Sequence, residues 1–109
     1  TMVFSLRILE VVESLPNTNK GRNVADQLCR SGTSVGANYR AAARAKSTAD
    51  FIHKMGTVEE EADEVLFWLE LIIRSGMLPE ARLQPLMKEA DEILAIVVSS
   101  IVTAKRNRQ

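Results

Sequence analysis

The chain has 109 residues, of which 46% are hydrophobic and 26% are charged, and this length is sufficient for one domain with its own hydrophobic core. Fourteen Lys and Arg residues balance fourteen Asp and Glu residues, which argues against a strongly basic, generic nucleic-acid-binding protein. The single cysteine, Cys29, excludes an intrachain disulfide and a zinc site built on several thiolates, and it predicts a buried thiol in a reducing compartment.

The two halves of the sequence differ in charge. Residues 1–56 carry eight basic and four acidic side chains, whereas residues 57–109 carry six and ten. A surface that binds a polyanion is therefore expected mainly on the first half. The apolar start "TMVFSLRIL" has no basic leader and is followed by Glu10 and Glu13. It is interpreted neither as a signal peptide nor as a membrane span, and we expect a cytoplasmic protein without membrane contact.

Two series of apolar residues with steps of three and four predict the first two helices. The first series covers residues 4–15 and is closed by Pro16, and "NTNKG" is the polar connection after it. The second series covers residues 24–42 and keeps its phase through Gly32 and Gly36. Two glycines inside a helix cost about 2 kcal/mol relative to alanine, so a loop is the alternative. Because a loop has no reason to preserve helical phase, we favour a tight crossing with the first or third helix.

The third and fourth series predict two further helices. Residues 51–72 step by four and three over six intervals without a fault, and Ser75 and Gly76 provide a helix stop. The fourth series covers residues 87–101. Because a proline inside a helix breaks it, we expect this helix to start near Pro85 or to be kinked there.

Four amphipathic segments with short connections and no strand signal predict an all-α fold, an antiparallel up-down-up-down four-helix bundle. Neither a repeat nor a domain boundary is evident, so residues 1–109 are interpreted as one domain. Its basic end "KRNRQ", about residues 105–109, is expected to fray.

The stretch "LCRSGTSVGANYRAA", with "ADFIHKMGTVEEEADEVLFWLELI" and "EADEIL" further along, resembles a known family. It is similar to the four-helix-bundle proteins encoded in intervening sequences of bacterial 23S ribosomal RNA genes, over nearly the whole chain. The most specific part is R-S-x-T-S-V-G-A-N, here Arg30 to Asn38; many members continue with N-I-A-E-G, where this chain has N-Y-R-A-A. The resemblance implies a bundle, a ring-shaped homo-oligomer that is often a pentamer, and no established enzymatic activity. The accessory variability protein of diversity-generating retroelements, which binds a reverse transcriptase and nucleic acid, is similar in fold.

Patterns for catalysis are weak in this sequence. A di-iron site in a bundle needs carboxylates on all four helices and two Glu-x-x-His motifs, but His53 is the only histidine and is interpreted as a surface or boundary residue. One histidine with scattered serines makes no recognisable triad, and there is no P-loop or dinucleotide fingerprint. We therefore predict no enzyme activity, no bound metal and no cofactor.

Angular positions on an ideal helix identify one candidate surface on the third predicted helix. Phe67 and Leu71 project away from the core stripe, on the face shared with Glu60 and Glu64. A large aromatic residue with a leucine one turn later on an outer face predicts an oligomer contact. The alternative is that these are scattered exposed apolar side chains, which are common.

The second candidate surface is on the second predicted helix, where four arginines share the face away from the core: Arg22, Arg30, Arg40 and Arg44. They are candidate contacts for RNA or DNA phosphates, together with the basic tail. The alternative is a solvated basic face, or ion pairs with the acidic third helix of a neighbouring subunit. Two functions follow: a non-catalytic oligomeric protein that binds RNA or DNA weakly, or an oligomeric scaffold whose partner is another protein.

Overall fold

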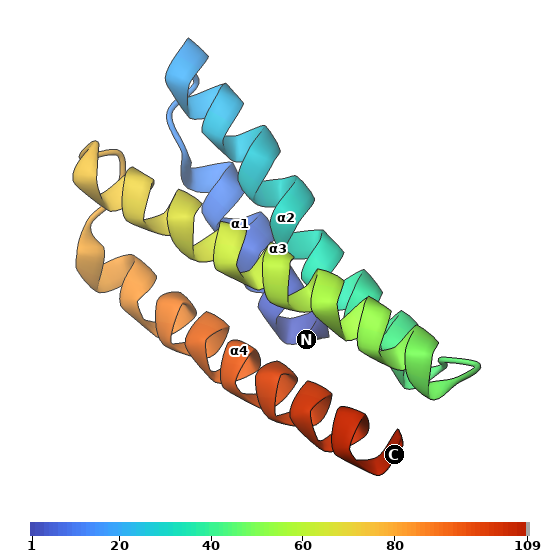
Figure 1. Ribbon diagram of the computed structural model, residues 1–109. Coiled ribbons are helices and arrows are strands. Elements are labelled where there is room, and N and C mark those ends of the chain that lie inside the picture. Colours follow the sequence, from blue (N-terminus) through green and yellow to red (C-terminus); the bar gives the residue numbers. More distant parts are fainter. Residues whose placement is uncertain (109) are drawn as a thin grey trace.

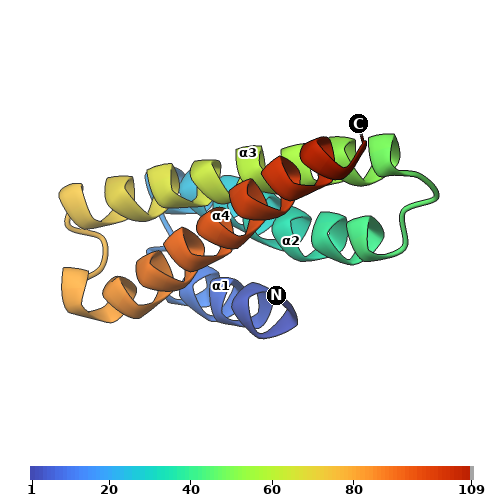
Figure 2. The same ribbon diagram turned by 60° about the horizontal axis from the view of Figure 1, so that its bottom comes forward.

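The structure, a computed structural model, describes residues 1–108 as four α-helices (Figure 1). They are α1 (Met2–Ser14), α2 (Asn19–Ala43), α3 (Thr48–Arg74) and α4 (Glu80–Arg108). Helix α1 packs on α2 and α4, and α3 packs on the same two helices, so α1 and α3 lie on opposite sides of the bundle (Figure 2). No strand occurs in residues 1–108. The predicted all-α, four-helix fold is confirmed.

One apolar core runs along the bundle and receives side chains from all four helices. Each helix turns one stripe inward, with the spacing of three and four that the sequence contains. In α3 the stripe from Val58 to Ile72 is completely buried. None of the helices in the described part of the chain combines the length and the apolar character that crossing a membrane requires.

Hydrogen-bonding residues and a glycine define where α2 and α3 begin and end. The side chain of Thr18 accepts a hydrogen bond from the Gly21 N–H at 3.1 Å, and that of Ser47 accepts one from the Asp50 N–H at 3.0 Å, as is usual for residues that precede a helix. Helix α3 ends before Gly76, whose φ of +79° is left-handed backbone that glycine adopts without strain. The stop predicted for α3 is therefore confirmed.

Of the two alternatives predicted for the fourth helix, a start near Pro85 is wrong, and a kink there stays a prediction. Helix α4 begins at Glu80, five residues before Pro85. The carbonyl of Pro79 accepts a hydrogen bond from the Arg82 N–H at 3.1 Å, which closes the first turn. Leu83 is fully buried, so this turn is held by packing on the core, which outweighs the hydrogen bond that Pro85 cannot donate.

The C-terminal end that was predicted to fray is helical in the described residues, and its fraying stays a prediction. Helix α4 continues through residues 105–108, whereas Gln109 lies outside the described residues. Cys29, predicted to be buried, is half-buried. Helix α2 starts within "NTNKG", at Asn19, so the connection from α1 is shorter than the sequence predicted.

Helix α1 is much shorter than the others and covers only part of the bundle. It has 13 residues, against 25 to 29 in α2, α3 and α4. Its N-terminus lies near the middle of the bundle, and the turn between α2 and α3 extends well beyond it (Figures 1 and 2). We call the part that α1 does not reach the three-helix end. It comprises residues 40–54 and 95–108, with Arg40 at its border, where Arg40 still lines a groove together with Thr1 and Met2 of α1.

Helix α1 contacts α2 closely at Gly32. A Cβ atom at Gly32 would lie 2.5 Å from Cγ2 and 2.8 Å from Cγ1 of Ile8, whose side chain is fully buried. The Ser5 hydroxyl donates a hydrogen bond to the Gly32 carbonyl at 3.2 Å, and it would lie 2.6 Å from a Cβ at Gly36. The helix that packs on both glycines is therefore α1, one of the two that the sequence allowed.

The same substitution at two helical glycines should have opposite effects on stability. Gly32→Ala forces a Cβ into Ile8 and should lower the free energy of unfolding by about 1 to 3 kcal/mol, and Gly32→Leu by more. Nothing lies within 4 Å of a Cβ built at Gly56 in α3, so Gly56→Ala should raise it by roughly 0.5 to 1 kcal/mol. Urea denaturation followed by circular dichroism measures both. A Gly32→Ala midpoint equal to that of the wild type would contradict a tight crossing.

Candidate functional site

Arg30 is paired with α3 of its own chain. Its Nη1 lies 3.1 Å from Oε2 of Glu61, and its Nη2 contacts Oε1 of Glu64. Glu64 also accepts a hydrogen bond from Nε1 of Trp68 at 3.2 Å. Two hydrogen bonds hold the pKa of Glu64 below its ordinary value. The one from Arg30 has the larger effect, and the one from Trp68 the smaller. The sequence placed Arg30 on the face of its helix away from the core, with ion pairs to the acidic third helix of another subunit as one alternative; in the structure it pairs with α3 of its own chain.

Arg22 also has partners within the chain. Its Nη1 donates to Oδ1 of Asn17 at 2.9 Å, and its Nη2 donates to Oδ1 of Asn19 at 2.7 Å. Both asparagines lie at the connection between α1 and α2, far from the three-helix end. Arg40 and Arg44 are exposed and form no ion pair within residues 1–108. The four arginines therefore do not form one uniform surface.

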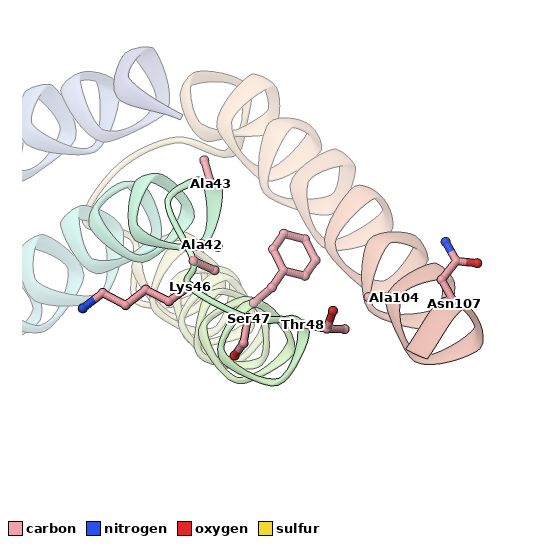
Figure 3. Close-up of a pocket in the computed structure, with 9 residues that line it drawn as sticks. Ala42, Ala43, Lys46, Ser47, Thr48, Ala104 and Asn107 are labelled. Atoms are coloured by element: carbon pink, nitrogen blue, oxygen red, sulfur yellow. The ribbon is translucent and has the colours of Figure 1, made fainter. Parts of the chain in front are cut away.

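The fold brings the end of α4 beside the turn between α2 and α3. Ala104 and Asn107 of α4 line the same open hollow, of about 460 Å³, as Ala42, Lys46 and Thr48 (Figure 3). Residues that are about 60 positions apart in the sequence thus meet at one end of the molecule.

This arrangement separates the charges of the chain along the bundle. The three-helix end holds seven basic residues, namely Arg40, Arg44, Lys46, Lys54, Lys105, Arg106 and Arg108. Its only acidic residue is Asp50, which accepts a hydrogen bond from Lys54 at 2.8 Å, and this bond is the main cause of a lowered pKa at Asp50. The remaining residues, 1–39 and 55–94, contain seven basic and thirteen acidic side chains. The three-helix end therefore has a net charge of +6 and the rest of the chain −6.

Sequence reasoning identified parts of this charge pattern without joining them. Residues 27–49 and 95–108 contain no acidic residue. In each segment, this absence already indicates a basic surface. The division into residues 1–56 and 57–109 hid the pattern, because it counted the basic end of α4 with the acidic middle of α3.

Phe67 and Leu71 lie on the outer face of α3, and their side chains are 57% and 38% exposed. The ring of Phe67 meets that of Trp68 edge to face, with 4.9 Å between ring centroids. The indole of Trp68 is held by its hydrogen bond to Glu64. Phe67 therefore packs on a fixed ring and projects outward. Their role in an oligomer contact remains a prediction.

An apolar groove between α1 and α2 escaped the sequence analysis. Its volume is about 660 Å³, and its lining comes from Thr1, Met2, Ser5, Leu6 and Leu9 of α1 and from Thr33, Gly36, Ala37 and Arg40 of α2. Met2 and Leu6 are 63% and 53% exposed, which is high for large apolar side chains. The signal was present in the sequence, because "TMVFSLRIL" is apolar on the face opposite the core as well as on the core face.

Metal-ligating side chains do not gather in the described part of the chain. Residues 1–108 contain no group of three or more His, Cys, Asp and Glu side chains placed to hold a metal ion. His53 is exposed on α3, in agreement with its interpretation as a surface or boundary residue. The candidate sites are therefore surfaces: the basic three-helix end, the outer face of α3 and the groove between α1 and α2.

These features define an all-α four-helix bundle with charged and apolar surfaces. The model of the 23S rRNA-intervening sequence protein family matches residues 1–99, and the chain belongs to this family. A solved structure of a protein with unknown function from the S23 ribosomal protein family, from Bacteroides thetaiotaomicron VPI-5482, is 37% identical to it. The match has a TM-score of 0.86 and covers 92% of this chain and 93% of that chain. No curated protein matches the sequence. The family resemblance in the sequence is confirmed.

The contribution of Glu64 to stability should depend on pH. The fold holds the pKa of Glu64 below its ordinary value of 4.5, so the ionised carboxylate stabilises the folded state above pH 4.5. This stabilisation is lost as the pH falls through the lowered pKa. Glu64→Gln should therefore be less stable than the wild type at neutral pH, and the difference should shrink in acid.

Denaturation midpoints measured from neutral to acid pH test this dependence. Glu60→Gln is the matched control, because Glu60 is exposed one turn away and makes no ion pair within residues 1–108. A difference between Glu64→Gln and the wild type that stays the same at every pH would contradict the assignment.

Proposed function

We propose that this protein is a non-catalytic, self-associating helical-bundle protein that binds RNA or DNA weakly through its three-helix end. The observation that carries the proposal is the separation of charge, +6 at the three-helix end against −6 elsewhere. Clustered Lys and Arg side chains attract a phosphodiester backbone regardless of its sequence, and each phosphate contact releases counterions. The acidic remainder of the chain keeps the affinity modest.

The proposed phosphate contacts are Arg44, Lys46, Lys105, Arg106 and Arg108. Arg44 comes from the face proposed on sequence grounds, whereas Arg40 of the same face lines the groove between α1 and α2. Arg22 and Arg30 are not included, since their guanidinium groups are engaged by Asn17 and Asn19 and by Glu61 and Glu64. Tyr39, the aromatic residue of α2, packs against the core and offers no base-stacking surface. Binding is therefore electrostatic and tolerant of sequence.

Self-association would multiply this weak binding. An oligomer repeats the basic end once per subunit, so contacts that are weak singly add through multivalency. The family resemblance implies a ring that is often a pentamer, and the exposed apolar side chains of α1 and α3 support self-association. The number of subunits follows from the mass measured by light scattering.

Removing charge at the three-helix end should weaken binding to nucleic acid. Arg44→Gln combined with Lys105→Gln and Arg106→Gln should reduce the affinity for labelled single-stranded RNA roughly tenfold or more at low salt. It should also flatten the plot of log affinity against log salt by ~0.7 for each phosphate that the variant no longer binds, the value for a single strand. Fluorescence anisotropy titrations at low and near-physiological salt measure both quantities.

The matched control removes the same charge elsewhere. Lys20→Gln combined with Arg22→Gln and Lys88→Gln changes three basic residues outside the three-helix end. This variant should bind almost as tightly as the wild type, with only a small loss from its lower net charge, provided that both variants keep the wild-type oligomer mass. Equal reductions of affinity in the two variants would contradict a site at the three-helix end.

An oligomeric protein scaffold without nucleic-acid binding is the second candidate. It is favoured by two separate groups of exposed apolar side chains, Met2 and Leu6 on α1 and Phe67 on α3, each of which is more than half exposed. If the wild-type protein binds no RNA or DNA at low salt, the scaffold function replaces nucleic-acid binding as the proposal.

A further inference from the structure

We infer that the outer face of α3 in one copy of the chain docks into the groove between α1 and α2 of a second copy. This inference rests on the self-association proposed above, and it assigns the two surfaces that meet. The observations that support it are a match of shape and a match of charge order.

The shapes of the two surfaces are complementary. The side of the groove formed by α2 carries small residues, Thr33, Gly36 and Ala37, and α1 contributes Leu6 and Leu9 on the other side. On α3, the large ring of Phe67 projects, with Leu71 one turn later. A projecting aromatic side chain in a hollow of small residues is the usual form of an interface anchor. A symmetric contact between two grooves would leave an unfilled space. A symmetric contact between two α3 faces would bring the two Phe67 rings against each other.

The charges follow opposite orders on the two surfaces. Along α1, Met2, Leu6, Leu9 and Glu13 succeed one another by four, three and four residues, so one stripe leads from the apolar groove to an acidic end. Arg40 lines the groove at its other end, near Met2. From the N-terminal to the C-terminal end of α1, the groove is therefore first basic, then apolar and finally acidic.

The outer stripe of α3 has the complementary order. Glu60, Glu64, Phe67, Leu71 and Arg74 succeed one another by four, three, four and three residues. This stripe therefore reads acidic, apolar, basic in the direction of α3. Glu64 also pairs with Arg30 of its own chain, and Arg74 pairs with Glu70 at 2.8 Å, a pair that is more than half exposed on both sides. Glu60, which makes no ion pair within residues 1–108, therefore carries the acidic end of the stripe.

The two stripes also match in length. The distance from Glu60 to Arg74 along an α-helix is ~21 Å, and that from Met2 to Glu13 is ~17 Å, with Arg40 beyond Met2. Placing α3 parallel to α1 sets Glu60 by Arg40, Phe67 between Leu6 and Leu9, and Arg74 by Glu13. Antiparallel docking would set like charges together at both ends, at a cost in free energy.

The contact is heterologous, since the two surfaces differ. Helices α1 and α3 lie on opposite sides of the bundle (Figure 2), so a copy that uses its groove still has a free α3 face. Such a contact produces a closed ring where the rotation between copies closes, and an open filament where it does not. Docking takes Arg40 into the interface and leaves the other basic residues of the three-helix end outside it.

A third set of exposed apolar side chains lies on α4, at Ile96, Val98 and Val102. No acidic residue lies between Ala95 and Arg108, so this set has no charge order that matches the groove or the α3 face. It supplies the control for the experiment.

Three double variants test the interface, each checked by circular dichroism for wild-type helix content. The groove variant is Leu6→Glu with Leu9→Glu, and the face variant is Phe67→Glu with Leu71→Glu. The control is Ile96→Glu with Val102→Glu, two exposed apolar residues of α4. Light scattering after size-exclusion chromatography gives the mass of each protein and of an equimolar mixture of the first two.

The expected result is specific to a heterologous contact. The groove variant and the face variant should each have the mass of one chain, and the control should keep the wild-type oligomer mass. Their mixture should form a complex of two chains and nothing larger, because the face variant still offers an intact groove and the groove variant an intact α3 face.

Other outcomes overturn the inference in distinguishable ways. A wild-type protein with the mass of one chain overturns both this interface and the proposed self-association. A wild-type oligomer whose groove or face variant keeps its full mass overturns the interface alone. A mixture of single-chain variants that stays at the mass of one chain also overturns it, since the surviving groove and α3 face then do not recognise each other.

Discussion

The contact of Ile8 with the backbone of α2 at Gly32 fixes the position of α1, and two of the three candidate surfaces, the groove and the three-helix end, depend on that position. A side chain at residue 32 would hold the two helices apart, because its Cβ would lie 2.5 Å from Ile8. Close packing there leaves the opposite face of α1 exposed beside Gly36, which creates the apolar groove. The shortness of α1 then leaves the basic ends of α2 and α4 uncovered.

The sequence was sufficient to predict the number of helices, their order and most of their inward faces. Steps of three and four fix which side chains face inward, and the core stripe of α3 from Val58 to Ile72 follows them. The start of α4 could not be predicted in the same way. Local rules place a helix start near a proline, but burial of Leu83 extends the helix across Pro85, and burial depends on the neighbouring helices.

Candidate sites were less predictable, because they depend on contacts between helices. Angular position placed Phe67 and Leu71 outside correctly, as exposure depends mainly on the face of one helix. The same reasoning grouped Arg30 with Arg40, although Arg30 lies near enough to α3 to pair with Glu61. The angle of a residue on its own helix does not give the direction of the neighbouring helix. Only the fold brings Lys46 and Lys105 to one end of the molecule.

The separation of charge gives this neutral protein a large electric dipole moment. Its net charge is zero, but +6 and −6 are divided along a molecule about 50 Å long. In dilute salt, the field of a polyanion would turn the molecule so that its basic end leads before any contact forms. At physiological ionic strength, screening acts over ~8 Å, far less than this length. Orientation would then begin only near the surface of the partner. A net charge of zero therefore does not mean that the protein approaches a charged partner equally from all sides.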